Sequence, residues 1–125
     1  MQKKPRPKHL DLFKIRLPIP GFVSILHRVS GAGLFLLIPF LLYLLQGSLS
    51  APEVYADLKQ MAAHWFVKLV LLGLLWAFLH HLFAGLRFLA LDLHYGIELE
   101  QARLTSILVL AVSIFLTLVI GVRLW

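Results

Sequence analysis

A serine, a histidine and an arginine share one face of a predicted helix at the start of a long apolar run. Ser24, His27, Arg28 and Gly31 are separated by three or four residues, the spacing of side chains on one helical face. Ionisable residues are costly inside a membrane, and there they mark functional sites by default. The hydroxyl and the guanidinium can both donate hydrogen bonds to a carbonyl or anionic ligand. The competing interpretation is an arginine that merely extends to lipid phosphate.

A second polar group lies within a later apolar run. His80 and His81 are adjacent and are followed by Ala84, Gly85 and Arg87. Neighbouring helical side chains point about 100° apart, so only one of the two histidines can face a given ligand. A histidine with a small residue one turn later can bind haem iron and leave a gap for the macrocycle. Both histidines have such a residue, so the spacing does not decide which of them would bind haem. It is equally compatible with a histidine that only hydrogen-bonds to a neighbouring helix.

The composition indicates an all-α integral membrane protein. The 125 residues are 60% hydrophobic and 14% charged, with a mean hydropathy of +0.87. A membrane-spanning helix needs about 20 apolar residues, which allows three transmembrane helices and leaves no room for a soluble catalytic domain. The chain has no cysteine, which excludes disulfides, thiolate metal sites and a cysteine nucleophile.

Six segments follow from the pattern of apolar and polar residues. They are a basic N-terminal segment (1–21), transmembrane helix I (22–46), an outer connection (47–65), transmembrane helix II (66–91), an inner loop (92–103) and transmembrane helix III (104–124). Pro39 predicts a kink in the first span. Ser50 and Glu53 resemble a capping box with Pro52 in the first turn, which predicts a short helix in the outer connection.

The basic residues predict the orientation. Seven of them lie before or at the start of the first span, within a net charge of +6: Lys3, Lys4, Arg6, Lys8, Lys14, Arg16 and Arg28. Basic flanks stay on the cytoplasmic side, so the N-terminus is expected to be cytoplasmic. No nucleic-acid partner is expected, since no aromatic residues interleave the cluster. The segment lacks the apolar core of a signal peptide, which favours a multi-pass protein of a bacterial inner membrane.

The predicted depths of the histidines constrain a haem. His81 precedes the end of the second span at Asp92 by 11 residues, which places it about 16 Å deep. His27 is expected near the inner surface, so the two cannot be opposite ligands of one iron. They can instead hold the iron at His81 and the propionates at His27 and Arg28. No other histidine of the chain is expected at the required depth, so a six-coordinate haem needs a histidine from a second chain.

Two motifs, "SILHRVSG" and "HHLFAGLRFLALD", together with the N-terminal "RPKHLDLFKIRLPI", occur in register with the predicted spans. In these features the chain resembles the cytochrome b subunits of succinate dehydrogenase, the larger of the two membrane anchors of succinate:quinone oxidoreductase. The resemblance covers most of the chain and implies three transmembrane helices. It also implies partners: a small second anchor in the membrane, an iron–sulfur subunit, a flavoprotein subunit and membrane lipid.

The resemblance implies roles for individual residues. The family's axial haem ligand lies four residues before a glycine, which selects His81 as the ligand of haem b iron. The second axial histidine comes from the smaller anchor. Ser24 and Arg28 match the family's quinone-site serine and arginine. His27, with Arg28, matches the residues near the haem propionates.

One departure from the family pattern falls in the second motif. Phe88 stands where the family usually has a histidine, and Leu86 replaces an isoleucine, so a polar role at Phe88 is not expected. Arg87 and Asp92 retain the family's polar residues at the inner end of the span, where they are expected to give support.

Two further function classes remain open on the sequence. A small helical transporter or channel subunit would use the intramembrane histidines and arginine as a proton relay and would carry no pigment. A purely structural assembly protein would tolerate the loss of His81. On the resemblance, the chain is no complete enzyme by itself, and it contributes quinone-site residues to an oxidoreductase whose flavin and iron–sulfur centres lie on other chains.

Overall fold

The computed structural model describes residues 15–125, so the first fourteen residues of the predicted basic segment lie outside the described part. Four helices follow one another in it: α1 (Ile19–Ser50), α2 (Pro52–Ala63), α3 (Trp65–Asp92) and α4 (Leu99–Leu124). Three of them, α1, α3 and α4, are long and apolar enough to cross a membrane. The all-helical fold with three transmembrane helices is therefore confirmed, while the cytoplasmic N-terminus stays a prediction.

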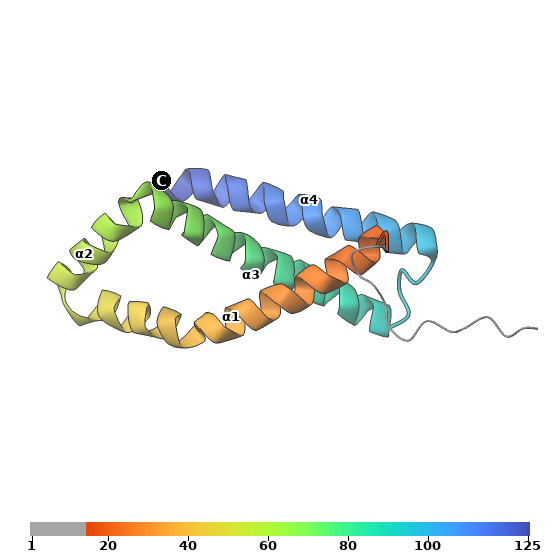
Figure 1. Cartoon of the computed structure of the whole chain (residues 1–125), viewed down its shortest axis with the longest axis horizontal. Helices are drawn as coiled ribbons and strands as arrows, with labels where there is room; N and C mark the ends of the chain where they lie inside the picture. Colours follow the sequence, from red (N-terminus) through yellow and green to blue (C-terminus); the bar gives the residue numbers. More distant parts are fainter. Residues whose placement is uncertain (1–14) are drawn as a thin grey trace, which may run out of the picture.

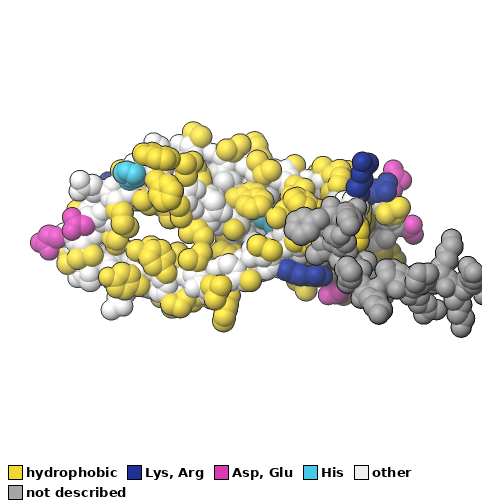
Figure 2. All heavy atoms as spheres, in the orientation of Figure 1, with side chains coloured by type: hydrophobic (Ala, Val, Ile, Leu, Met, Phe, Trp, Pro, Cys, Tyr) yellow, Lys and Arg dark blue, Asp and Glu magenta, His cyan; other side chains and the backbone are white. Residues whose placement is uncertain are grey.

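Large apolar side chains cover the outside of the molecule. Leu36 and Val122 expose 75% and 81% of their surface, and they are typical of α1 and α4. In Figure 2 hydrophobic side chains cover the middle of the visible face, and charged side chains gather at its two ends. A soluble protein rarely exposes such a continuous apolar surface. The hydrocarbon of a bilayer is the solvent that this band fits.

The helices cross near one end and separate at the other. Figure 1 shows α4 running alongside α3, while α1 crosses α3 nearer to the turn that joins α3 to α4. We call this end the α3–α4 end and the opposite one the α2 end. Helix α1 changes direction about midway, and Pro39 lies within it. A proline inside a helix lacks the N–H for the i−4 carbonyl, which accounts for the bend.

Helix α2 joins the separated ends of α1 and α3. It begins with Pro52 in its first turn, as predicted, but Ala51 is its N-cap residue and forms no side-chain cap bond. The predicted capping box is wrong, because the Ser50 hydroxyl donates to the Gly47 carbonyl at 2.8 Å. The serine thus completes α1 instead of starting α2.

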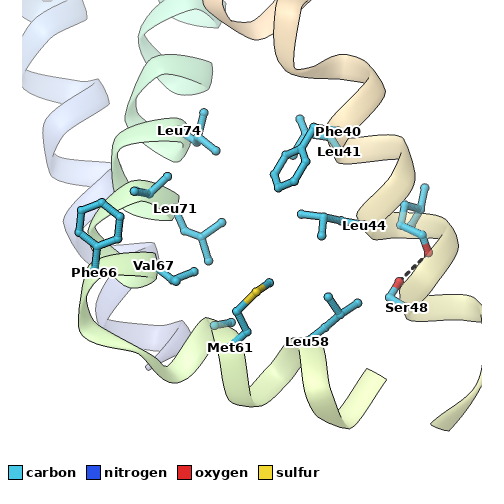
Figure 3. A pocket seen from close by; sticks show the side chains of 13 residues that line it. Phe40, Leu41, Leu44, Ser48, Leu58, Met61, Phe66, Val67, Leu71 and Leu74 are labelled. Atoms are coloured by element: carbon cyan, nitrogen blue, oxygen red, sulfur yellow. Dashed lines mark hydrogen bonds between the residues drawn. The ribbon is translucent and has the colours of Figure 1, made fainter. Parts of the chain in front are cut away.

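The separation of α1 and α3 leaves an open apolar pocket of about 490 Å³ at the α2 end. Figure 3 shows Phe40 and Leu44 of α1 facing Leu71 of α3, with Met61 of α2 closing the end. Ser48 also lines the pocket, but its hydroxyl donates to the Leu45 carbonyl at 2.7 Å. The pocket therefore presents hydrocarbon and no free hydroxyl donor.

Helix α4 packs on its neighbours with small and hydroxyl-bearing residues. Ser106, Ser113, Thr117 and Gly121 are all buried. Each of the three hydroxyls donates to a carbonyl of its own helix, at 2.7 to 3.0 Å. Small residues permit close helix approach in membranes, and such back-bonding satisfies the hydroxyl donor where no water is present.

A buried arginine connects α3 to the beginning of α4. Arg87 is 8% exposed. Its Nε donates to Thr105 Oγ1 at 3.0 Å and its Nη2 donates to the Ala102 carbonyl at 3.3 Å. Because a buried guanidinium needs hydrogen-bond acceptors, these two bonds hold the α3–α4 end together.

We expect Thr105→Val to lower the stability of the protein by about 1.5–3 kcal/mol, because it removes the acceptor of a charged donor while keeping the side-chain shape. The matched control is Thr117→Val, which removes a buried hydroxyl bonded only within α4. Thermal unfolding of the protein in mild detergent, with its partner subunits, compares the two. Equal losses for both variants would contradict the role given to the Arg87 bond.

Candidate functional site

Two histidine rings lie face to face where α1 crosses α3. The imidazoles of His27 and His81 have centroids 4.2 Å apart and planes inclined by 6°. The His27 ring also contacts the Phe88 ring, with ring centroids 5.1 Å apart and the two planes tilted relative to each other. The crossing thus brings the two polar groups of the sequence, one on each helix, into a single site.

The hydrogen bonds of His81 determine which ring nitrogen carries its proton. Its Nδ1 lies 3.0 Å from the carbonyl oxygen of His27. A carbonyl oxygen only accepts hydrogen bonds, so a neutral His81 must hold its proton on Nδ1 and donate it. The lone pair of Nε2 is then available to bind a metal ion. This is the usual arrangement of a metal-binding histidine, whose second nitrogen donates to a carbonyl or carboxylate.

Ser30 is a member of this site that the sequence analysis did not identify. The side chain is 8% exposed. Its hydroxyl donates to the His27 carbonyl at 3.0 Å, and its oxygen lies 3.3 Å from His81 Nδ1. The sequence did contain a signal, since Ser30 belongs to the "SILHRVSG" motif and lies three residues after His27, about one turn along the same helix.

Glycines at the crossing make room for imidazoles. A Cβ atom on Gly31 would lie 2.6 Å from Cε1 and 3.1 Å from Nδ1 of His81. A Cβ atom on Gly85 would lie 3.5 Å from Nε2 of His27. The gap that was predicted beside Gly85 for a macrocycle therefore holds the His27 ring. The small residue that makes room for the His81 ring is Gly31, on α1.

The predicted difference in depth between His27 and His81 is wrong. Stacked rings lie at the same level along the bundle. Helix α1 begins at Ile19, so His27 is already eight residues into it, which is about 12 Å at the helical rise. The conclusion that the two are not opposite ligands of one iron has a different basis, since parallel rings 4.2 Å apart leave no space for a metal between them.

His80 has surroundings unlike those of His81. It is 0% exposed, and neither ring nitrogen has a hydrogen-bond partner within the described residues. Its ring stacks on Trp76 of the same helix, with centroids 5.3 Å apart. His81 is only partly buried. Of the two, His81 is therefore the histidine that a ligand at the surface of this chain can approach.

Ser24 and Arg28 share the face of α1 that carries His27. Arg28 is exposed and Ser24 is half-buried. Within residues 15–125 neither side chain forms a hydrogen bond or an ion pair. Their hydrogen-bond donors therefore have no acceptor among the described residues.

The two residues predicted to support the inner end of the second span have different surroundings. Arg87 bonds to α4, as described above, and its guanidinium carbon lies 5.4 Å from the centroid of the Phe88 ring. Asp92 is exposed and forms no ion pair with the described residues. Arg87 is thus a packing contact of α4, and Asp92 is exposed at the end of α3 without an ion-pair partner among residues 15–125.

No cluster of three or more histidine, cysteine or carboxylate side chains suited to a metal ion occurs in residues 15–125. The site offers the His81 imidazole, with its Nε2 lone pair available, and Arg28 and Ser24 supply cationic and hydroxyl donors on α1. It can supply a single axial ligand to a metal whose remaining ligands come from a macrocycle and another chain.

The chain is similar to known proteins along nearly its whole length. The model of the family described as "Succinate dehydrogenase/Fumarate reductase transmembrane subunit" matches residues 2–120. The succinate dehydrogenase cytochrome b556 subunit of Coxiella burnetii is 38% identical over 121 residues, covering 96% of this chain and 97% of the relative. The b556 subunit of Paracoccus denitrificans is 34% identical, covering 90% and 85%. The b560 subunit of Reclinomonas americana is also 34% identical, covering 93% and 83%.

We expect Gly31→Ala to destabilise the protein by about 1–3 kcal/mol, because the new methyl group overlaps the His81 ring in a packed crossing. Gly33→Ala is the matched control on the same helix, since a Cβ atom there meets nothing within 4 Å. That variant should gain about 0.5–1 kcal/mol from the better helix propensity of alanine. Thermal unfolding in detergent measures both, and a Gly31→Ala protein as stable as Gly33→Ala would show that the crossing is looser than described.

Proposed function

The chain belongs to the family of succinate dehydrogenase/fumarate reductase transmembrane subunits, and on that basis we propose that it binds haem b together with a second membrane subunit and forms part of the quinone-reduction site. It is a cytochrome b subunit of the membrane anchor of succinate dehydrogenase, a multi-pass membrane protein that acts with the other subunits of complex II. We propose further that particular residues of this chain carry out these tasks and that the protein lies in a bacterial inner membrane.

His81 is the proposed axial ligand of the haem iron. The observation that carries this assignment is the contact between Nδ1 and the His27 carbonyl, which leaves Nε2 as the metal-binding nitrogen. The partly exposed position of His81 supports it further, because a haem shared between two chains must lie at the surface of each. His80 is enclosed within this chain and does not meet that requirement.

The second axial histidine is proposed to come from the smaller membrane anchor. Within the described residues the ring nearest to His81 is that of His27, whose stacking on His81 is incompatible with binding the opposite side of the iron. We propose instead that His27 and Arg28 contact the haem propionates, as the resemblance to the family implies. When bound, the haem supplies a one-electron carrier whose potential depends on its axial ligands and their hydrogen bonds.

Ser24 and Arg28 are the proposed quinone-binding residues. Both lie on one face of α1, and the exposed Arg28 has free donors within the described structure. The guanidinium can donate hydrogen bonds to a quinone carbonyl and stabilise the negative charge that develops as electrons arrive from the iron–sulfur subunit. The Ser24 hydroxyl can donate a second hydrogen bond to a quinone oxygen.

We expect His81→Ala to abolish the b-type α-band in a dithionite-reduced minus oxidised spectrum of the complex purified in mild detergent, because the iron loses its ligand from this chain. His80→Ala, a change at the adjacent residue, should keep the band. A band that survives His81→Ala would refute the assignment. A wild-type complex that contains all partner subunits and shows no band would remove the haem from the proposal and leave a quinone-site anchor or the transporter class to be tested.

We expect Arg28→Leu to lower succinate:quinone reductase activity by at least about 100-fold, the cost of removing one donor from a site of developing charge. Succinate oxidation with an artificial acceptor should be unchanged, since that reaction occurs on other subunits. Arg103→Leu removes another exposed arginine and should leave both activities intact. Normal quinone turnover in the Arg28→Leu complex would exclude this residue from the quinone site.

A further inference from the structure

The hydrogen bonds around Ser30 point to a role beyond helix packing. We propose that Ser30 is a positioning residue for the axial ligand, and that its hydroxyl adjusts the electron-donating strength of His81 through the carbonyl that the two side chains share. This inference rests on the proposed function, since it takes His81 as the axial ligand. It concerns a residue that makes no contact with the metal itself.

Three donors converge on one carbonyl oxygen. The His27 oxygen accepts from Ser30 Oγ at 3.0 Å and from His81 Nδ1 at 3.0 Å. Its position inside α1 also makes it the i−4 acceptor of the Gly31 backbone N–H. A carbonyl oxygen has two lone pairs, so the three donors compete for it. The hydroxyl of Ser30 therefore reduces the acceptor strength available to His81.

The geometry excludes the opposite assignment, in which Ser30 donates to an unprotonated Nδ1. That arrangement would direct the Nδ1 lone pair at the lone pairs of the His27 oxygen, 3.0 Å away. The Ser30 oxygen is also farther from Nδ1, at 3.3 Å, than from the carbonyl, at 3.0 Å. The consistent pattern has Nδ1–H donating chiefly to the carbonyl and Ser30 donating to the same atom.

The direction of the effect follows from this competition. A stronger bond from Nδ1–H to its acceptor makes the imidazole a more basic ligand. A more basic ligand favours the ferric over the ferrous iron and lowers the reduction potential. Removal of the Ser30 hydroxyl frees the carbonyl for His81 and is therefore expected to lower the haem potential, whereas loss of a purely structural serine would leave it unchanged.

Ser113 provides a matched control within the same chain. It is 0% exposed, and its hydroxyl donates to the Leu110 carbonyl, three residues earlier, at 3.0 Å. Ser30 forms the same type of bond, with the same length, to the carbonyl of His27. The difference is that His81 shares the carbonyl bonded by Ser30, and no histidine within residues 15–125 hydrogen-bonds to the Leu110 carbonyl.

The test is a spectroscopic redox titration of haem b in the purified complex. Ser30→Ala should retain the α-band and shift the equilibrium constant for haem reduction downward by up to about tenfold, which is about 59 mV for a one-electron couple. Ser30→Thr, which keeps a hydroxyl, and Ser113→Ala should both give the wild-type potential. The low-spin ferric EPR signal provides a second readout and should change in Ser30→Ala alone.

An unchanged potential in Ser30→Ala, or the same shift in Ser113→Ala, would overturn the positioning role. If Ser30→Ala does not assemble, Ser30→Cys replaces the hydroxyl with a weaker donor and should shift the potential in the same direction, and its failure to do so would also refute the proposal. Failure of the proposed function itself has a different signature, since it would leave the α-band intact in His81→Ala.

Discussion

A carbonyl oxygen cannot donate a hydrogen bond, and the site depends on that constraint. The His27 carbonyl oxygen lies at the crossing of α1 and α3, where it accepts a hydrogen bond from Nδ1 of His81 on the opposite helix. The bond joins two helices that are long and apolar enough to cross a membrane, where an unpaired donor would be costly. It also leaves the Nε2 lone pair of His81 free to bind a metal ion. One contact thus sets both the packing of the helices and the chemistry of the ring.

One part of the bundle is joined by hydrogen bonds between helices, and the other part is apolar. From the crossing to the α3–α4 end, helices are joined by hydrogen bonds, first His81 to α1 and then Arg87 to α4. Toward the α2 end α1 and α3 separate, and the pocket between them presents almost only hydrocarbon (Figure 3). Because polar groups in lipid need partners, the hydrogen-bonded part of the bundle is where the chain can hold charged and hydroxyl side chains. The proposed haem and quinone residues all lie in that part.

Helix geometry gives the two adjacent histidines different surroundings. His80 is enclosed and stacked on Trp76, and His81 is partly exposed and hydrogen-bonded to α1. The angle of about 100° between neighbouring side chains produces this difference. A fully enclosed imidazole can contribute to packing within one chain. A cofactor shared by two chains requires the partly exposed one.

The sequence by itself determined the fold class, because three long apolar runs have no stable place in water and must form helices in a bilayer. It also identified the candidate residues, since a polar side chain within such a run is conspicuous: Ser24, His27, Arg28, His80, His81 and Arg87. The family motifs, which concern the order of residues along the chain, were equally accessible. Those features depend on composition and on spacing within one helix.

Only the tertiary structure decided how the helices meet. Three contacts depend on the position of the crossing. They are the stacking of His27 on His81, the proximity of Ser30 to His81, and the fit of the His27 ring against Gly85. The depth predicted for His27 was wrong for the same reason, as it was counted along one helix from an assumed end. Spacing along a helix fixes which side chains share a face, whereas the point at which two helices cross depends on the packing of both surfaces together.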